Sequence, residues 1–113
     1  MNNDLKDRTK KFALAIIDVV EKLPNTIPGR AIGNQLVRSG TSVASNYRAA
    51  SRGRSDKEFV AKLGVVIEEA DESELWLELI HEKKWADVEI YIKEAKELTA
   101  IFVSIVLKMK NRN

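Results

Sequence analysis

The sequence predicts an all-α protein, an antiparallel four-helix bundle with up-down-up-down topology. Apolar residues recur at alternating spacings of three and four in four separate segments, which is the pattern of amphipathic helices. Only two prolines and five glycines interrupt the 113 residues, and no segment shows the alternation typical of a half-buried strand. The connections between segments are short, so neighbouring helices are expected to run antiparallel. We expect residues 1–113 to form one domain.

Two helices are expected in the N-terminal half, at about residues 4–23 and 30–52. The first helix carries one apolar stripe, formed by Leu5, Phe12, Ile16, Val19 and Leu23. Residues 25–29 break that pattern, and Pro28 suits the first turn of the next helix. The apolar side of the second helix consists of Ile32, Leu36, Val43, Tyr47 and Ala50.

The middle of the second helix has weak intrinsic helix propensity. Residues 39–42, Ser-Gly-Thr-Ser, are all poor helix formers, so tertiary packing must hold this turn. Small residues also allow another backbone to approach closely. We therefore expect a tight helix crossing at Gly33, Gly40 and Ala44.

Two further helices are expected in the C-terminal half, at about residues 55–83 and 87–110. Ser55 and Glu58 form a capping-box pattern for the first, and Asp87 is expected to cap the second. Heptad spacing typical of a bundle runs through both helices. The two stripes are Phe59, Leu63, Val66, Ala70, Ser73, Leu77 and Ile80, and Val88, Tyr91, Ala95, Leu98, Phe102, Ile105 and Met109.

The composition indicates a soluble protein of a reducing compartment. Cysteine is absent, so disulfides and thiolate metal sites are excluded. The N-terminal residues lack the basic and apolar regions of a signal peptide, and the apolar run at residues 100–107 is too short to span a bilayer. We expect a cytoplasmic protein that makes no contact with a membrane.

Sequence patterns for catalysis are missing. A di-metal bundle site needs two Glu-x-x-His motifs on different helices, but Glu78 and His81 form the single one, and His81 is the only histidine. Phosphate-binding glycine loops are absent, and the lone histidine completes no nucleophilic triad. We predict a protein that is not an enzyme and has no metal or cofactor.

Basic residues of the second helix form an ordered surface stripe. At 100° per residue, the polar residues of its outer face fall within roughly an 80° arc, and Arg54 follows the helix. The candidate nucleic-acid-binding residues are Arg30, Asn34, Arg38, Arg48, Arg52 and Arg54. They bind phosphate, or they pair with the acidic residues of the third helix; the sequence leaves both readings open. Because no aromatic residue interleaves the stripe, we expect electrostatic binding without base stacking.

A second apolar surface is expected on the third helix, away from its core stripe. The four residues concerned are Val65, Leu75, Trp76 and Leu79. A helix that is apolar on two sides must bury both, and aromatic anchors are typical of subunit interfaces. We predict that these residues form an oligomer interface. The alternative is that Trp76 lies at the edge of the intramolecular core.

Three segments resemble a known family. Residues 34–47 (Asn-Gln-Leu-Val-Arg-Ser-Gly-Thr-Ser-Val-Ala-Ser-Asn-Tyr), residues 55–59 (Ser-Asp-Lys-Glu-Phe) and residues 69–74 (Glu-Ala-Asp-Glu-Ser-Glu) look like the four helix bundle protein family. That family includes proteins encoded in intervening sequences of bacterial 23S ribosomal RNA genes. It is similar to the accessory variability determinants of diversity-generating retroelements. The resemblance spans nearly the whole chain.

The resemblance implies a small antiparallel bundle that assembles as a homopentamer. In the retroelement branch of the resemblance, a basic surface binds nucleic acid and the partner reverse transcriptase, whereas many other relatives have no established role. Arg38, Arg52 and Arg54 match basic positions of the family pattern. We expect an oligomeric accessory protein that binds RNA or DNA, or a nucleic-acid enzyme. The alternative is a protein–protein interaction or scaffold module with no role in nucleic-acid binding.

Overall fold

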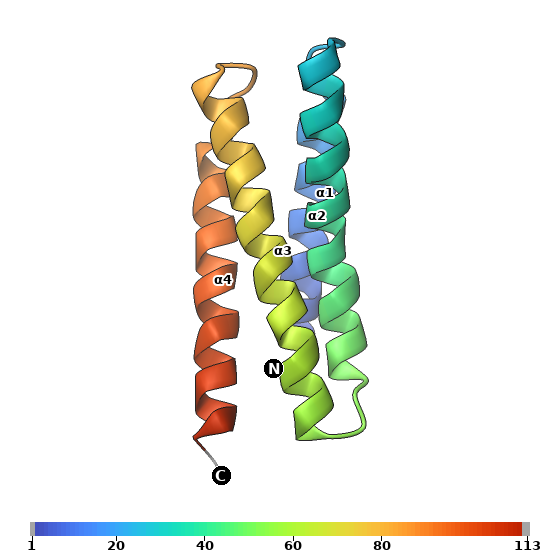
Figure 1. Cartoon of the computed structure of the whole chain (residues 1–113), viewed down its shortest axis with the longest axis vertical. Helices are drawn as coiled ribbons and strands as arrows, with labels where there is room; N and C mark the ends of the chain where they lie inside the picture. The colour runs from blue at the N-terminus through green and yellow to red at the C-terminus, as the bar shows by residue number, and fades with distance from the viewer. Residues whose placement is uncertain (1, 112–113) are drawn as a thin grey trace.

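The computed structural model describes the backbone of residues 2–111 and the side chains of residues 4–111, and it contains four helices in that range. They are α1 (Asn2–Glu21), α2 (Ile27–Ser51), α3 (Asp56–Glu82) and α4 (Glu89–Lys110). Figure 1 shows them side by side and antiparallel, in a rod of 49 × 21 × 20 Å. The predicted four-helix bundle is confirmed. We call the end with the 52–55 connection and both termini the lower end.

Side-chain caps explain where α2 and α3 begin. The Thr26 hydroxyl accepts a hydrogen bond from the Gly29 amide at 3.1 Å, and with Pro28 in the first turn it starts α2 three residues earlier than predicted. At α3 the Ser55 hydroxyl accepts from the Glu58 amide at 3.1 Å, which confirms the predicted cap.

The start of α4 differs from the prediction. Val88 is the residue before the first turn, and no side chain caps the helix. The Asp87 carboxylate accepts from the Glu89 amide only at a long 3.5 Å, so Asp87 is not the cap that the sequence indicated. The preceding helix ends at Glu82, and Lys84, two residues later, has a left-handed φ of 59° that turns the chain towards α4.

The core follows the predicted stripes. Every stripe residue of α3 except the half-buried Phe59 is buried, and α4 buries Ala95, Leu98 and Phe102, with Val88 buried just before its first turn. Tyr47 of α2 reaches Phe102, with ring centroids 5.4 Å apart. These contacts join α2, α3 and α4 in one apolar interior, which is the main stabilising term of such a fold.

The middle of α2 is continuous helix in spite of its weak propensity. Gly40 packs so closely on Ile16 of α1 that an added Cβ would lie 2.8 Å from that side chain. Gly33 similarly faces Val20 of α1, at 3.3 Å. The Thr41 hydroxyl donates to the Val37 carbonyl at 2.6 Å, as helical threonines do. The predicted tight crossing is confirmed at both glycines.

The four helix interfaces are unequal. Helix α2 packs extensively on α1 and α3, and α3 on α4, whereas α1 and α4 touch sparsely. The main polar link between α1 and α4 is Arg8, which donates to both oxygens of Glu94 at 2.7 Å and lies 3.0 Å from Glu97. Hydrogen bonds to these carboxylates raise the pKa of Arg8 above its ordinary value. The bundle is therefore most open between α1 and α4.

Candidate nucleic-acid interface

Arg38, in the middle of the basic stripe, is held by carboxylates of the same chain. Its guanidinium donates to Glu69 at 3.1 Å, to Glu72, and to the amide oxygen of Gln35 at 3.3 Å. Glu72 also accepts from the Trp76 indole at 3.1 Å. Hydrogen bonds to Glu72 and, to a lesser extent, to Glu69 raise the pKa of Arg38. At Arg38 the structure therefore favours intramolecular pairing with acidic residues over phosphate binding.

The upper part of the stripe is partly engaged. The Arg30 guanidinium donates to the Asn25 side-chain oxygen at 2.9 Å, within the turn that leads into α2. This neutral partner leaves the positive charge of Arg30 uncompensated. Asn34 is exposed on the same face.

The lower part of the stripe is different. Arg48, Arg52 and Arg54 are all exposed, and none forms an ion pair with a residue that the structure describes. Arg48 and Arg52 lie one turn apart on the outer face of α2, and Arg54 follows in the connection to α3. These guanidinium groups remain available to an external anion.

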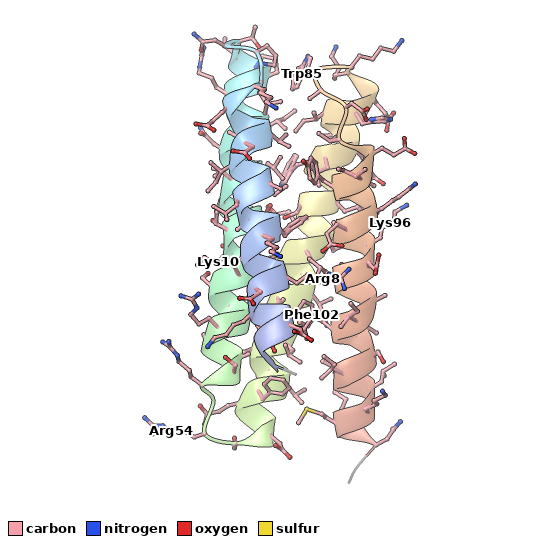
Figure 2. All side chains as sticks on the ribbon, turned by 180° about the vertical axis from the view of Figure 1, so that it is seen from behind. Arg8, Lys10, Arg54, Trp85, Lys96 and Phe102 are labelled. Carbon is pink, nitrogen blue, oxygen red and sulfur yellow. The ribbon has the colours of Figure 1, made fainter. Side chains whose placement is uncertain are left out.

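Two lysines of α1 lie beside these arginines. Lys6 and Lys10 are about one turn apart and share one flank of α1. Arg8, two residues from each, lies on the opposite flank and reaches Glu94 of α4, which places the lysines on the flank next to α2. Figure 2 shows Lys10 on the same edge of the molecule as Arg54, with Arg8 on the other side of α1.

The register of α1 against α2 brings the two sets together. Gly40 packs on Ile16, and antiparallel helices advance equally from that contact, so Arg48 is level with the turn between Lys6 and Lys10. We call the combined set the basic cluster: Lys6, Lys10, Arg48, Arg52 and Arg54. Lys6 is half-buried and the other four are exposed, and no ion pair joins any of the five to another described residue.

The sequence-based prediction omits both lysines because it follows charge along one helix at a time. Their spacing of four, beside the apolar stripe of α1, was the available signal. This spacing becomes informative only once the structure shows that α2 lies beside that flank of α1. Side by side, the two helices form one positively charged surface.

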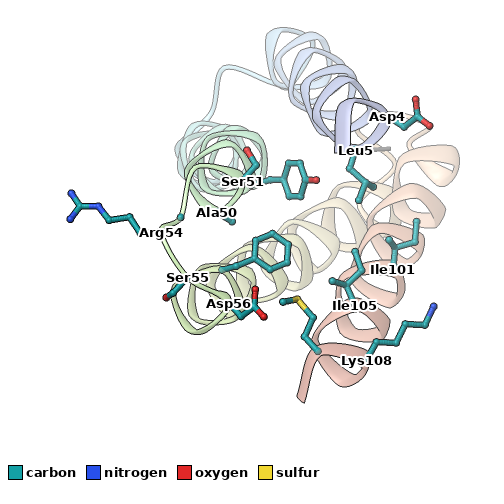
Figure 3. Close-up of a pocket in the computed structure, with 14 residues that line it drawn as sticks. Asp4, Leu5, Ala50, Ser51, Arg54, Ser55, Asp56, Ile101, Ile105 and Lys108 are labelled. Atoms are coloured by element: carbon teal, nitrogen blue, oxygen red, sulfur yellow. The ribbon is translucent and has the colours of Figure 1, made fainter. Parts of the chain in front are cut away.

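A cavity of about 980 Å³ opens at the lower end, next to the basic cluster, and is lined by the ends of all four helices and by the 52–55 connection. Leu5, Phe59, Ile101 and Ile105 form much of its apolar wall, and Arg54 is on its rim. Figure 3 shows Leu5, Ile101 and Ile105 pointing towards one another, whereas Arg54 points away. No sequence pattern predicts this cavity, because it depends on how segments distant in the chain meet at the lower end.

The predicted interface residues of α3 fall into two kinds. Val65, Leu75 and Leu79 are exposed by 37%, 47% and 36%, so three apolar side chains face solvent from one helix. Trp76 is half-buried and packs against the core cluster. Trp76 therefore lies at the edge of the intramolecular core, which was the alternative interpretation of the sequence. The three aliphatic residues remain available to a partner.

Two properties of the described residues bear on the kind of site. Within residues 4–111 no three histidine or acidic side chains gather closely enough to suggest a metal site. None of the described helices combines the length and the apolar character that crossing a membrane requires.

Comparison with known proteins gives a family. The 23S rRNA-intervening sequence proteins match residues 1–106. A crystal structure of a protein of unknown function from the S23 ribosomal protein family of Bacteroides thetaiotaomicron is 31% identical, with a TM-score of 0.82 over 93% of this chain and 96% of that one. No curated protein sequence matches. The chain therefore belongs to the 23S rRNA-intervening sequence protein family.

Proposed function

We propose that this protein is a non-enzymatic accessory protein that binds nucleic acid electrostatically through the basic cluster. The proposal depends on one observation: five cations on adjoining faces of α1 and α2 form no ion pair with any described carboxylate. Arginine forks suit phosphate oxygens bidentately, and lysines add point charges. Because the family description names 23S rRNA, RNA is the first nucleic acid to test.

The proposal includes assembly and location. We expect a cytoplasmic homo-oligomer, with five copies by family resemblance. By the same resemblance, the nucleic-acid enzyme that it assists would be a reverse transcriptase. Three exposed aliphatic residues on α3 support self-association, because an oligomer covers such side chains.

Replacing Arg48, Arg52 and Arg54 by glutamine together tests nucleic-acid binding. We expect affinity for a short RNA to fall roughly a hundredfold at about 0.1 M salt, because three phosphate contacts and their released counterions are lost. Fluorescence anisotropy over a salt series measures the change. The matched control replaces the same arginines by lysine, which keeps the charge and should keep most of the affinity. Unchanged binding in the glutamine variant would remove the cluster from the proposal.

A second candidate function is a protein-interaction module that does not bind nucleic acid. The exposed apolar residues Val65, Leu75 and Leu79 favour it. Light scattering should show an assembly well above the 12.8 kDa monomer, and Leu75→Glu should reduce its size with helical content unchanged. Glu68→Gln, a change at another exposed residue of α3, is the control. Assembly without any RNA binding at low salt would favour this module; a monomeric wild type would contradict the oligomer.

A further inference from the structure

We propose that the cavity at the lower end holds an unpaired nucleobase of a single strand whose phosphates lie on the basic cluster. This inference depends on the proposed function and deepens it, because it specifies single-stranded nucleic acid. The outer face of α2 has no aromatic residue to stack on, and the cavity supplies the apolar and aromatic wall that this face lacks.

The wall has the composition of a base-binding site. Phe59 is half-buried at the N-terminal end of α3, and Leu5, Ile101 and Ile105 face it from α1 and α4. Stacking on aromatic and apolar side chains is how proteins bind unpaired bases without strong sequence preference. The volume, about 980 Å³, is at the upper end of the usual size of small-molecule sites.

Two cations at the mouth of the cavity determine the path of the nucleic-acid strand. Arg54 in the 52–55 connection and Lys108 of α4 both line the cavity, and Figure 3 shows them pointing outwards on opposite sides of it. A strand with phosphates on both cations crosses the mouth and turns a base towards the wall. Arg54 also belongs to the basic cluster, so the cavity continues the surface that binds phosphate.

Two carboxylates at the mouth distinguish base from phosphate. Asp4 and Asp56 line the cavity; they repel a phosphate but accept hydrogen bonds from exocyclic amino groups. Adenine, cytosine and guanine carry such a group, and uracil does not. We therefore expect oligoadenylate to bind more tightly than oligouridylate.

The experiment compares a short oligoadenylate with an abasic oligomer of equal length, by anisotropy at one salt concentration. Because both carry the same phosphates, a purely electrostatic surface binds them equally. We expect the wild type to bind oligoadenylate roughly tenfold more tightly. Phe59→Leu, which removes the ring, and Ile101→Gln, which makes the apolar wall polar without changing its charge, should each abolish that preference and leave the salt dependence unchanged.

The outcomes separate this inference from the proposed function. Equal, salt-dependent binding of both oligomers overturns the base site and leaves electrostatic binding intact. Binding of neither oligomer overturns both. A preference for oligoadenylate that survives Ile101→Gln also overturns the base site. This variant serves even if Phe59→Leu fails to fold, because the side chain at position 101 is only half-buried. Circular dichroism establishes that each variant is folded.

Discussion

The middle and the lower end of α2 use similar residues in opposite ways. In the middle, Gly40 packs on Ile16 and Arg38 is held by two glutamates of α3. At the lower end, Arg48 and Arg52 belong to the same stripe of α2 as Arg38 and also point outwards, but no described carboxylate pairs with them. The difference is made by the neighbouring helix, since Glu69 and Glu72 of α3 reach Arg38, whereas Asp56 and Glu58 at the lower end of α3 form no ion pair with Arg48 or Arg52.

This contrast shows that an arginine stripe is not a binding site in itself. An arginine whose donors are already bonded to carboxylates must break those bonds before it meets a phosphate. An exposed and unpaired arginine loses only water. We therefore expect the availability of each guanidinium, and not its presence, to determine which part of the stripe can bind an anion.

The largest expected effect concerns the packing of the middle region. Gly40→Ala should destabilise the fold by about 2 kcal/mol, because the new Cβ lies 2.8 Å from Ile16 in a packed interface. Thermal unfolding should show a melting temperature lower by about 10 °C. Gly64→Ala is the matched control: nothing lies within 4 Å of its added Cβ, so better helix propensity should stabilise by about 1 kcal/mol. Equal effects of the two variants would contradict the tight crossing.

The second prediction concerns the middle of α2, where removing the partners of Arg38 should make this arginine available to RNA. Glu69→Gln with Glu72→Gln removes both carboxylate partners of Arg38. RNA affinity should rise roughly tenfold, because one more phosphate contact becomes available. The control is Glu68→Gln with Asp71→Asn, which removes equal charge from exposed positions of α3 that do not contact Arg38. A similar gain in both variants would mean that net charge, and not the release of Arg38, sets the affinity.

A smaller effect is expected from the buried polar contact between α2 and α3. The hydroxyls of Ser39 and Ser73 are 2.8 Å apart, and both residues are fully buried. Ser73→Ala should cost about 1 kcal/mol in the free energy of unfolding, since a buried hydrogen bond is lost. Ser45→Ala, on the exposed outer face, should change stability by less than about 0.5 kcal/mol. Denaturant unfolding measures both variants.

The fold was predictable because helix periodicity and capping are local. The stripes of α3 and α4 and the Ser55 cap are visible in the sequence, and each is confirmed. The start of α4 was not predictable to the residue. Asp87 is a good cap by residue type, but the left-handed turn at Lys84 and the burial of Val88 fix where the chain can enter the helix.

The candidate site was predictable only in part. Outward direction along α2 follows from the helical period, so the arginine stripe could be drawn from the sequence. The pairing of Arg38 with Glu69 depends on the register between α2 and α3, which no local pattern specifies. The positions of Lys6 and Lys10 likewise depend on which helix lies beside their flank of α1.

The most direct test of the account is a single matched pair of variants, Arg52→Gln and Arg38→Gln. For each, the slope of log affinity for RNA against log salt is measured and compared with the wild type. We predict that Arg52→Gln reduces the slope for a single-stranded RNA by about 0.7, the value for one lost phosphate contact, and that Arg38→Gln leaves it unchanged. Equal reductions in the two variants, or no reduction for Arg52→Gln, would contradict the claim that only unpaired arginines bind nucleic acid.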